Sequence, residues 1–370
     1  MRLIGLIRLM RPMRPMRPMR PMRPIGLIGL IGLISACSSE QAPEPQVPEP
    51  EKQETAIAFT VNLSEEEVTR ATRPLEDYTT SFVVWAFKNM TETAGTYSDL
   101  QTVMPGYHVD WTENTAATTT TNTHDWEYIL LAFPDQTIKF WDFAAKAYRF
   151  FAVAEMNPEP GTWDTSSDPN AYKYTCNADA TNAEDAPFYS RLWFSNGDEV
   201  AYPTRLYGKP VTLEFIKPFA EVVFKFTYSD PSATPKPMLE EPDFRPATIG
   251  ERIATTGTVT ITFPIQGTAT QESWTSAVDD SKYLLAFTVP EQVYTVLPIA
   301  SQGVYQLKVT VNGEDKTCTV PAQYMSWNPG YRYTYIFKVS DEGGVELESV
   351  NIGVKKWQEG KTADHIIYNW

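Results

Sequence analysis

Residues 304–320 read VYQLKVTVNGEDKTCTV, and this stretch indicates the class of fold. Apolar and polar residues alternate over 304–311, which is the period of a half-buried β-strand. Asn312-Gly313 follows, a pair that favours the left-handed backbone of a type I′ turn. Residues 316–320 then form the returning strand. The stretch therefore predicts a β-hairpin.

Short segments of the same kind occur along the whole chain. We expect strands over residues 56–63, 81–87, 126–131, 148–154, 211–216, 220–226, 257–263, 283–289, 293–297, 331–339 and 345–354. No segment keeps a helical apolar period over twelve residues. The pattern predicts an all-β protein built of β-sandwiches. The polar residues 156–188 are expected to form a long loop, and the proline-rich residues 229–246 an interdomain region.

The composition narrows the possible functions. Hydrophobic residues make up 42% of the 370 residues, which is enough for a packed core. The formal net charge of −15 disfavours a protein that grips nucleic acid phosphates. The chain has three Cys, three His and none of the common catalytic motifs. We therefore expect no enzyme activity, no metal and no other cofactor.

The first 36 residues differ from the rest of the chain. They hold seven Arg and no acidic residue, and an Ile-Gly-Leu repeat covers 25–34. Ten apolar residues are too few to span a bilayer as a helix, but they suit the apolar part of a signal peptide. Ser35-Ala36-Cys37 follows and resembles a bacterial lipobox, with Cys37 as the lipid-modified residue. The alternative is an ordinary signal peptide in which Cys37 is incidental.

The chain is expected to have four parts. These are a signal peptide, an extended acidic and Pro-rich tether, and two β-sandwich domains, over residues 1–36, 37–55, 56–232 and 233–370. Cys176 and Cys318 would lie in different domains. Two separate thiols are therefore favoured over a disulfide, although a location outside the cytoplasm would permit one.

Several phrases along the chain are similar to the fimbrillin superfamily of pilus-building lipoproteins from Bacteroidales, in particular to its Mfa-like branch. They are IAF (57–59) with TR (69–70), WEY (126–128), KFWD (139–142), YRFFA (148–152), VTLEF (211–215) with AEVVF (220–224), WNPGYRYTY (327–335) and VKKW (354–357). Together with the lipobox, these phrases span nearly the whole chain in the order that the family has.

The resemblance implies a fold, a location and a role. The fold would be two transthyretin-like β-sandwich domains in tandem. The protein would be a fimbrial subunit at the cell outer membrane, held there by the lipid on Cys37. Its partners would be other fimbrial subunits and, through adhesion, host glycans or proteins. The resemblance also implies that a trypsin-like protease cuts after an Arg, removes the first strand, and leaves a groove for a strand of another subunit.

The residues allow this route of assembly. The first strand presents four large apolar side chains on one face, those of Ile57, Phe59, Val61 and Leu63. The segment 365–370 presents a similar face, made by Ile366, Tyr368 and Trp370. Such a strand could satisfy both the apolar trough and the unpaired backbone that the first strand would leave. Alternatively, this segment packs as a strand in its own domain.

Arg70 is the expected cleavage residue, because it precedes Ala71 in a polar, turn-like stretch. Arg73 precedes Pro74, which usually blocks such proteases. Alternatively, Arg70 is a plain surface base.

A different class of function also fits the sequence. The chain could be a monomeric surface lipoprotein that binds glycans, with aromatic residues such as Tyr107 and Trp111 stacking on sugars. Trp141, Trp327 and Trp357 are expected to be core residues instead. A third possibility is an orphan lipoprotein of the same fold that never assembles.

Overall fold

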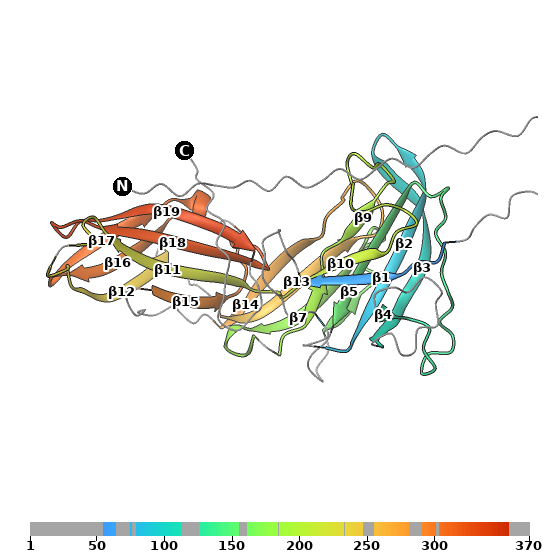
Figure 1. Cartoon of the computed structure of the whole chain (residues 1–370), viewed down its shortest axis with the longest axis horizontal. Coiled ribbons are helices and arrows are strands. Elements are labelled where there is room, and N and C mark those ends of the chain that lie inside the picture. The colour runs from blue at the N-terminus through green and yellow to red at the C-terminus, as the bar shows by residue number, and fades with distance from the viewer. Residues whose placement is uncertain are drawn as a thin grey trace, which may run out of the picture. The chain divides into compact units, whose positions relative to one another are not determined.

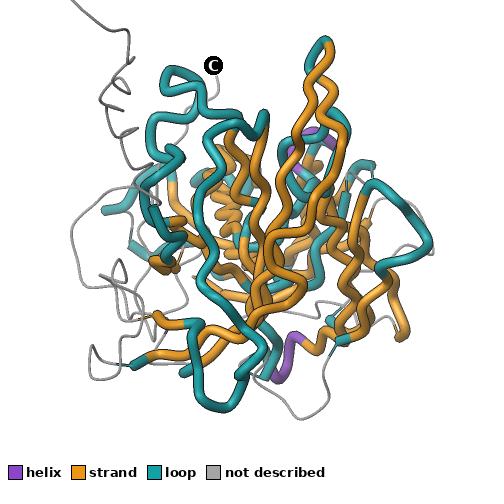
Figure 2. The backbone as a smooth tube through the Cα atoms, turned by 90° about the vertical axis from the view of Figure 1, so that its right-hand side faces the viewer, coloured by secondary structure: helices purple, strands orange, loops and turns teal. Residues whose placement is uncertain are grey.

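The computed structural model describes residues 55–63, 75, 79–112, 126–154, 161–183, 185–232, 234–246, 255–280, 291–300 and 303–354. Helical turns in these residues are short, such as Ala180–Asn182 and Ala322–Tyr324 (Figure 2). None of the described helices is long and apolar enough to cross a bilayer. The strands are β1 (Phe59–Leu63), β2 (Ser81–Thr93), β3 (Thr96–Trp111), β4 (Trp126–Glu127), β5 (Ala147–Ala154), β6 (Thr162–Asp164), β7 (Ala171–Asp179), β8 (Phe188–Ser190), β9 (Trp193–Ser195), β10 (Val211–Ile216), β11 (Ala220–Tyr228), β12 (Leu239–Pro246), β13 (Thr256–Pro264), β14 (Ser273–Asp280), β15 (Glu291–Val296), β16 (Tyr305–Val311), β17 (Glu314–Val320), β18 (Tyr331–Val339) and β19 (Val345–Val354).

Seven strands of the first sheet form a closed ring (Figure 1). Their order is β2-β3-β4-β1-β10-β8-β5, and β5 pairs back with β2. β9 also pairs with β5, next to β8. Inside the ring lies a hydrophobic core that includes Phe82, Phe150 and Phe215. A closed sheet has no free edge, so each strand of the ring depends on its two neighbours.

A second, four-stranded sheet covers part of the ring. Its order is β14-β13-β7-β6, and Phe263 of β13 stacks on Phe151 of β5 at 4.4 Å between ring centroids. β5 is therefore buried on both faces and at all of its positions. Arg149 of β5 is also buried, and its guanidinium donates to the carbonyls of Gly267 and Ala269 at 3.2 Å each. These bonds tie the turn between β13 and β14 to the ring.

The remaining strands form a separate sandwich, with sheets of order β15-β11-β18-β19 and β12-β16-β17. Its core contains Trp327, which is fully buried. The indole Nε1 of Trp327 donates to the hydroxyl of Tyr335 at 2.8 Å, and that hydroxyl donates to the carbonyl of Tyr324. Burial raises the pKa of the Tyr335 hydroxyl well above its usual value. The hydroxyl therefore stays protonated, and the network is intact, at physiological pH.

The structure confirms the all-β class and the hairpin at 304–320. β16 and β17 pair antiparallel, with Val311 opposite Glu314. Asn312 and Gly313 between them have φ of 52° and 82°, as a type I′ turn requires. Cys176 on β7 and Cys318 on β17 are buried and form no disulfide, as expected.

Strand pairing divides the chain differently from the single boundary expected between residues 232 and 233. β11 precedes that point, yet it is a central strand of the second sandwich. β13 and β14 follow that point, yet β13 pairs with β7 against the ring. The chain therefore enters the second sandwich, returns to the first sheets and enters the second sandwich again.

The long loop expected over residues 156–188 and the interdomain region expected over residues 229–246 were both wrong. Residues 156–188 contain β6 and β7, whose alternation is hard to see because small residues such as Ala171 and Ala178 take buried positions. The proline-rich residues 229–246 contain β12, which pairs with β16 despite an irregular register between Glu240 and Asp243. β3 was not expected either, since its pairing with β2 is broken by two register shifts.

Gly330 allows a test of close packing. Its φ is +79°, and a Cβ built there would lie 3.1 Å from side-chain atoms of Ile216 on β10. Gly313 has a similar φ, but a Cβ there would meet open space. Gly313→Ala should cost only the backbone strain of about 1–2 kcal/mol. Gly330→Ala should lose roughly 1–3 kcal/mol more in urea unfolding, because the site is overpacked. Equal losses would contradict this contact.

Candidate functional site

The groove that holds β1 is the candidate functional site. β1 pairs in parallel with β10, with Phe59 opposite Val211 and Leu63 opposite Phe215. Its other neighbour is the two-residue strand β4, where Phe59 lies opposite Trp126. β1 is thus an interior strand of the ring and is contributed by the first described residues of the chain (Figure 1).

The first strand and the residues just before it turn apolar side chains into the core of the ring. Ile57 and Phe59 are fully buried, and Val61 is half-buried against the same core. The Phe59 ring makes edge contacts with three aromatic rings, Phe82 at 6.3 Å, Tyr128 at 5.9 Å and Phe150 at 6.1 Å. The backbone of Leu63 pairs with that of Phe215 on β10. The groove is therefore an aromatic trough that closes around one large side chain.

The residues just before β1 pair with a separate segment of the chain. The amide of Ile57 donates to the carbonyl of Lys139 at 2.7 Å, and the amide of Trp141 donates to the carbonyl of Thr55 at 2.9 Å. Ala56 and Phe140 form an antiparallel bridge between these two bonds. We call residues 139–141 the strap, because they hold the leading end of the first strand. These residues belong to the KFWD phrase over 139–142, but their backbone pairing leaves no pattern in the sequence.

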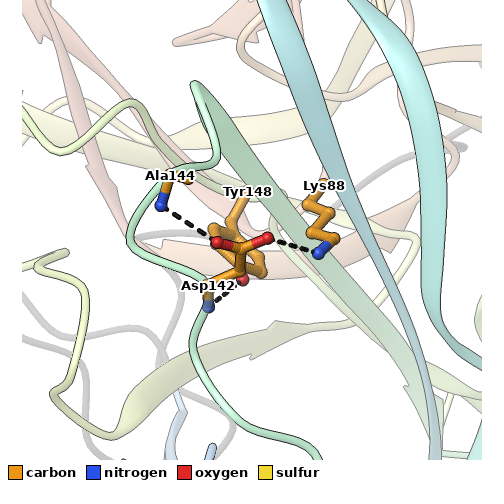
Figure 3. Close-up of polar contacts among 4 residues, drawn as sticks. All are labelled: Lys88, Asp142, Ala144 and Tyr148. Atoms are coloured by element: carbon orange, nitrogen blue, oxygen red, sulfur yellow. Dashed lines mark hydrogen bonds and ion pairs between the residues drawn. The ribbon is translucent and has the colours of Figure 1, made fainter. Parts of the chain in front are cut away.

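Asp142 fixes the end of the strap (Figure 3). Its carboxylate accepts from Lys88 Nζ of β2 at 2.6 Å and from the amide of Ala144 at 3.0 Å. Its own amide donates to the hydroxyl of Tyr148 on β5 at 2.7 Å. The strap is thereby attached to two strands of the ring. Trp141 is buried among aromatic rings, as predicted.

Tyr128 joins the strap to the first strand. Its hydroxyl donates to the carbonyl of Ile57 at 2.9 Å and accepts from the amide of Lys139 at 3.2 Å. Burial raises the pKa of Tyr128 to about 12. The hydroxyl thus keeps its proton, and donates to the first strand, across the physiological pH range.

Several predicted site residues lie outside the described residues. They are Cys37, Arg70, Ile366, Tyr368 and Trp370, together with the core candidate Trp357. The predicted cleavage position falls between two described anchors. β1 ends at Leu63, and Leu75 is buried in the ring core.

The aromatic residues weighed for sugar stacking are engaged in the fold. Tyr107 and Trp111 belong to β3, not to a loop. Tyr107 is buried and its hydroxyl accepts from the amide of Thr137, while Trp111 packs on Trp126 at 5.4 Å. No cluster of three or more metal-ligating side chains occurs among the described residues.

Comparison with known proteins gives the family. A profile of the Fimbrillin-like family matches residues 69–357. The chain therefore belongs to the fimbrillin-like family, as the resemblance in its sequence indicated. No curated protein matches it.

Solved structures with a similar chain trace include proteins from two Bacteroides species. One is a candidate cell adhesion protein from Bacteroides uniformis, at 14% identity and a TM-score of 0.39, covering 82% of this chain and 99% of that chain. Another is a fimbrial protein from Bacteroides vulgatus, at 12% identity and a TM-score of 0.39, with the same two coverages.

The first prediction for the site concerns the trough. Phe59→Ala should lower the free energy of unfolding by about 3–5 kcal/mol, because it empties the space between three rings. Thr60→Ala, on the opposite face of β1, loses only its contact with the Thr212 hydroxyl and should cost about 1 kcal/mol or less. Urea denaturation measures both. Similar losses would show that β1 does not fill a core.

The second prediction concerns the strap. Asp142→Asn removes the charge that pairs with Lys88, and at this partly exposed site the ion pair contributes up to about 1 kcal/mol. Amide exchange of Ile57, which donates to the strap, should rise by up to about fivefold. Asp135→Asn, an exposed acid between β4 and β5, is the matched control. An unchanged exchange rate in Asp142→Asn would show that the stability of the strap does not depend on this ion pair.

Proposed function

We propose that this protein is a fimbrial subunit that is exported as an outer-membrane lipoprotein and assembles by exchange of its first strand. The observation that carries the proposal is the position of β1 in a closed ring. Its partners in the fibre would be copies of itself or related subunits, and its role cell adhesion. Membership of the fimbrillin-like family supports a fimbrial role.

Loss of β1 would expose apolar surface and unpaired backbone that another strand could cover. Ile57 and Phe59 are both fully buried, and each contributes roughly 1.5–3 kcal/mol by leaving water. The backbone of β10 would also lose its partner along Val211–Phe215. A groove with an apolar floor and an unpaired edge is the surface that strand addition fills.

Cleavage after Arg70 would allow β1 to leave. It would separate β1, which ends at Leu63, from Leu75, which would stay in the ring core. Ile366, Tyr368 and Trp370 supply the large alternating side chains of a replacement strand. The export signal ending at Ala36 and the lipid on Cys37 complete the proposal, and the tether over 37–55 would place the ring away from the membrane.

Limited trypsin digestion of the chain from residue 38 tests the proposal. We expect cleavage after Arg70, release of the β1 fragment and growth of oligomers. Intact mass detects the cleavage, and size-exclusion chromatography detects the oligomers. Arg70→Ala should remain uncut there and monomeric, whereas Arg73→Ala, at the bond before Pro74, should behave as the parent. A stable uncut monomer under the same digestion would refute strand removal and favour a monomeric glycan-binding lipoprotein.

A further inference from the structure

Three tyrosine hydroxyls from different parts of the ring hold the segment that contains the strap. Each hydroxyl accepts a hydrogen bond from a backbone amide of this segment. The pairs are Tyr107 on β3 with Thr137 at 3.3 Å, Tyr128 just after β4 with Lys139 at 3.2 Å, and Tyr148 on β5 with Asp142 at 2.7 Å. These three bonds are independent of β1. The strap would therefore keep these supports if β1 left, and it forms a preorganised surface beside the groove.

The strap and Tyr128 hydrogen-bond to the backbone just before β1. The amide of Trp141 donates to the carbonyl of Thr55, and the carbonyl of Lys139 accepts from the amide of Ile57. The hydroxyl of Tyr128 donates to the carbonyl of Ile57. Loss of the first strand would leave these three groups to bind another extended chain. The third residue of that chain must supply an amide hydrogen, which excludes proline at this position.

Phe140 limits the size of the side chain that fits between these bonds. It forms an antiparallel bridge with Ala56. The hydrogen bonds lie on either side of this bridge, which makes it a non-hydrogen-bonded pair whose side chains approach closely on one face. Ala56 is 7% exposed and Phe140 is 40% exposed. A larger side chain in place of Ala56 would meet the Phe140 ring.

We propose that the strap, with Tyr128, is a preformed subsite for the leading end of a strand donated by another fimbrial subunit. It takes an extended segment in which a small residue, such as Ala or Gly, precedes a large apolar one. The small residue would lie against Phe140, and the large one would be buried as Ile57 is now. A slip by one residue would exchange the two, so the subsite also sets the register of the incoming strand. This inference deepens the proposed function and rests on it.

The experiment measures peptide binding to the chain from residue 38 after trypsin has cut it and has been inhibited. The probes are a fluorescein-labelled peptide of residues 55–63 and the same peptide with Ala56→Leu. Each competes with β1 for the groove, and fluorescence anisotropy gives its apparent affinity. We expect Ala56→Leu to weaken binding by about tenfold or more, because the subsite is overpacked.

Variants of the chain assign this preference to the strap. Phe140→Ala should bring the two peptides within about threefold of each other, because it opens space for the larger side chain. Phe143→Ala is the matched control, since Phe143 is an exposed aromatic residue just beyond the strap. It should leave the preference at about tenfold or more. Tyr128→Phe should weaken both peptides about equally, by roughly fivefold, because it removes a hydrogen bond to the backbone.

A second measurement uses the uncut chain and needs neither cleavage nor assembly. Ala56→Leu should raise the exchange rate of the Ile57 amide by about tenfold or more, because local opening at the strap becomes easier. Adding Phe140→Ala should reverse most of that rise. Exchange that is unchanged by Ala56→Leu would overturn the size limit set by Phe140.

The two measurements separate failure of the subsite from failure of the proposed assembly. If the cut chain forms oligomers but binds both peptides equally, the subsite is refuted and strand exchange stands. The same holds if Phe140→Ala leaves the preference unchanged. If the chain is not cut, or if no peptide displaces β1, the proposed assembly fails. The strap would then serve only the first strand of its own chain, and a site for another subunit would be refuted with it.

Discussion

The pairing of β1 with β10 is the constraint on which the first half of the structure depends. Without it the ring has β10 on one side and the two-residue β4 on the other, and neither can reach across the aromatic core. The paired strands are far apart in sequence, since Thr60 and Thr212 are separated by 152 positions. Contacts of this range have a high entropy cost of loop closure, which packing in a core must offset. Phe59 supplies that packing, because its ring lies among three others.

Local patterns in the sequence predicted the local structure well. The Asn-Gly turn specified its hairpin, and β18 has the bounds that its apolar run indicated. The order in which the chain alternates between the ring and the second sandwich could not be predicted. Alternation shows that a segment is a strand but not which strand it pairs with. β13 and β11 look alike in sequence, and only their partners β7 and β18 separate them. Bulges hid β3, since each one reverses the alternation.

The same limit applies to the candidate site. The buried face of Ile57 and Phe59 could be predicted from a period of two. The strap could not, because its bonds to Thr55 and Ile57 are made by backbone atoms and its anchor, Asp142, is one acid among 46. A carboxylate that binds Lys88 across two elements leaves no signal in one sequence. Such contacts form only after the fold has brought the two elements together.

The covalent link between β1 and the ring sets the order of the proposed exchange. The groove surrounds β1 with a fully buried aromatic trough. A strand from another subunit would therefore compete with a tethered β1, whose effective concentration is of the order of millimolar. Proteolysis would remove that advantage, and the order of cleavage before exchange would follow from the covalent chain itself.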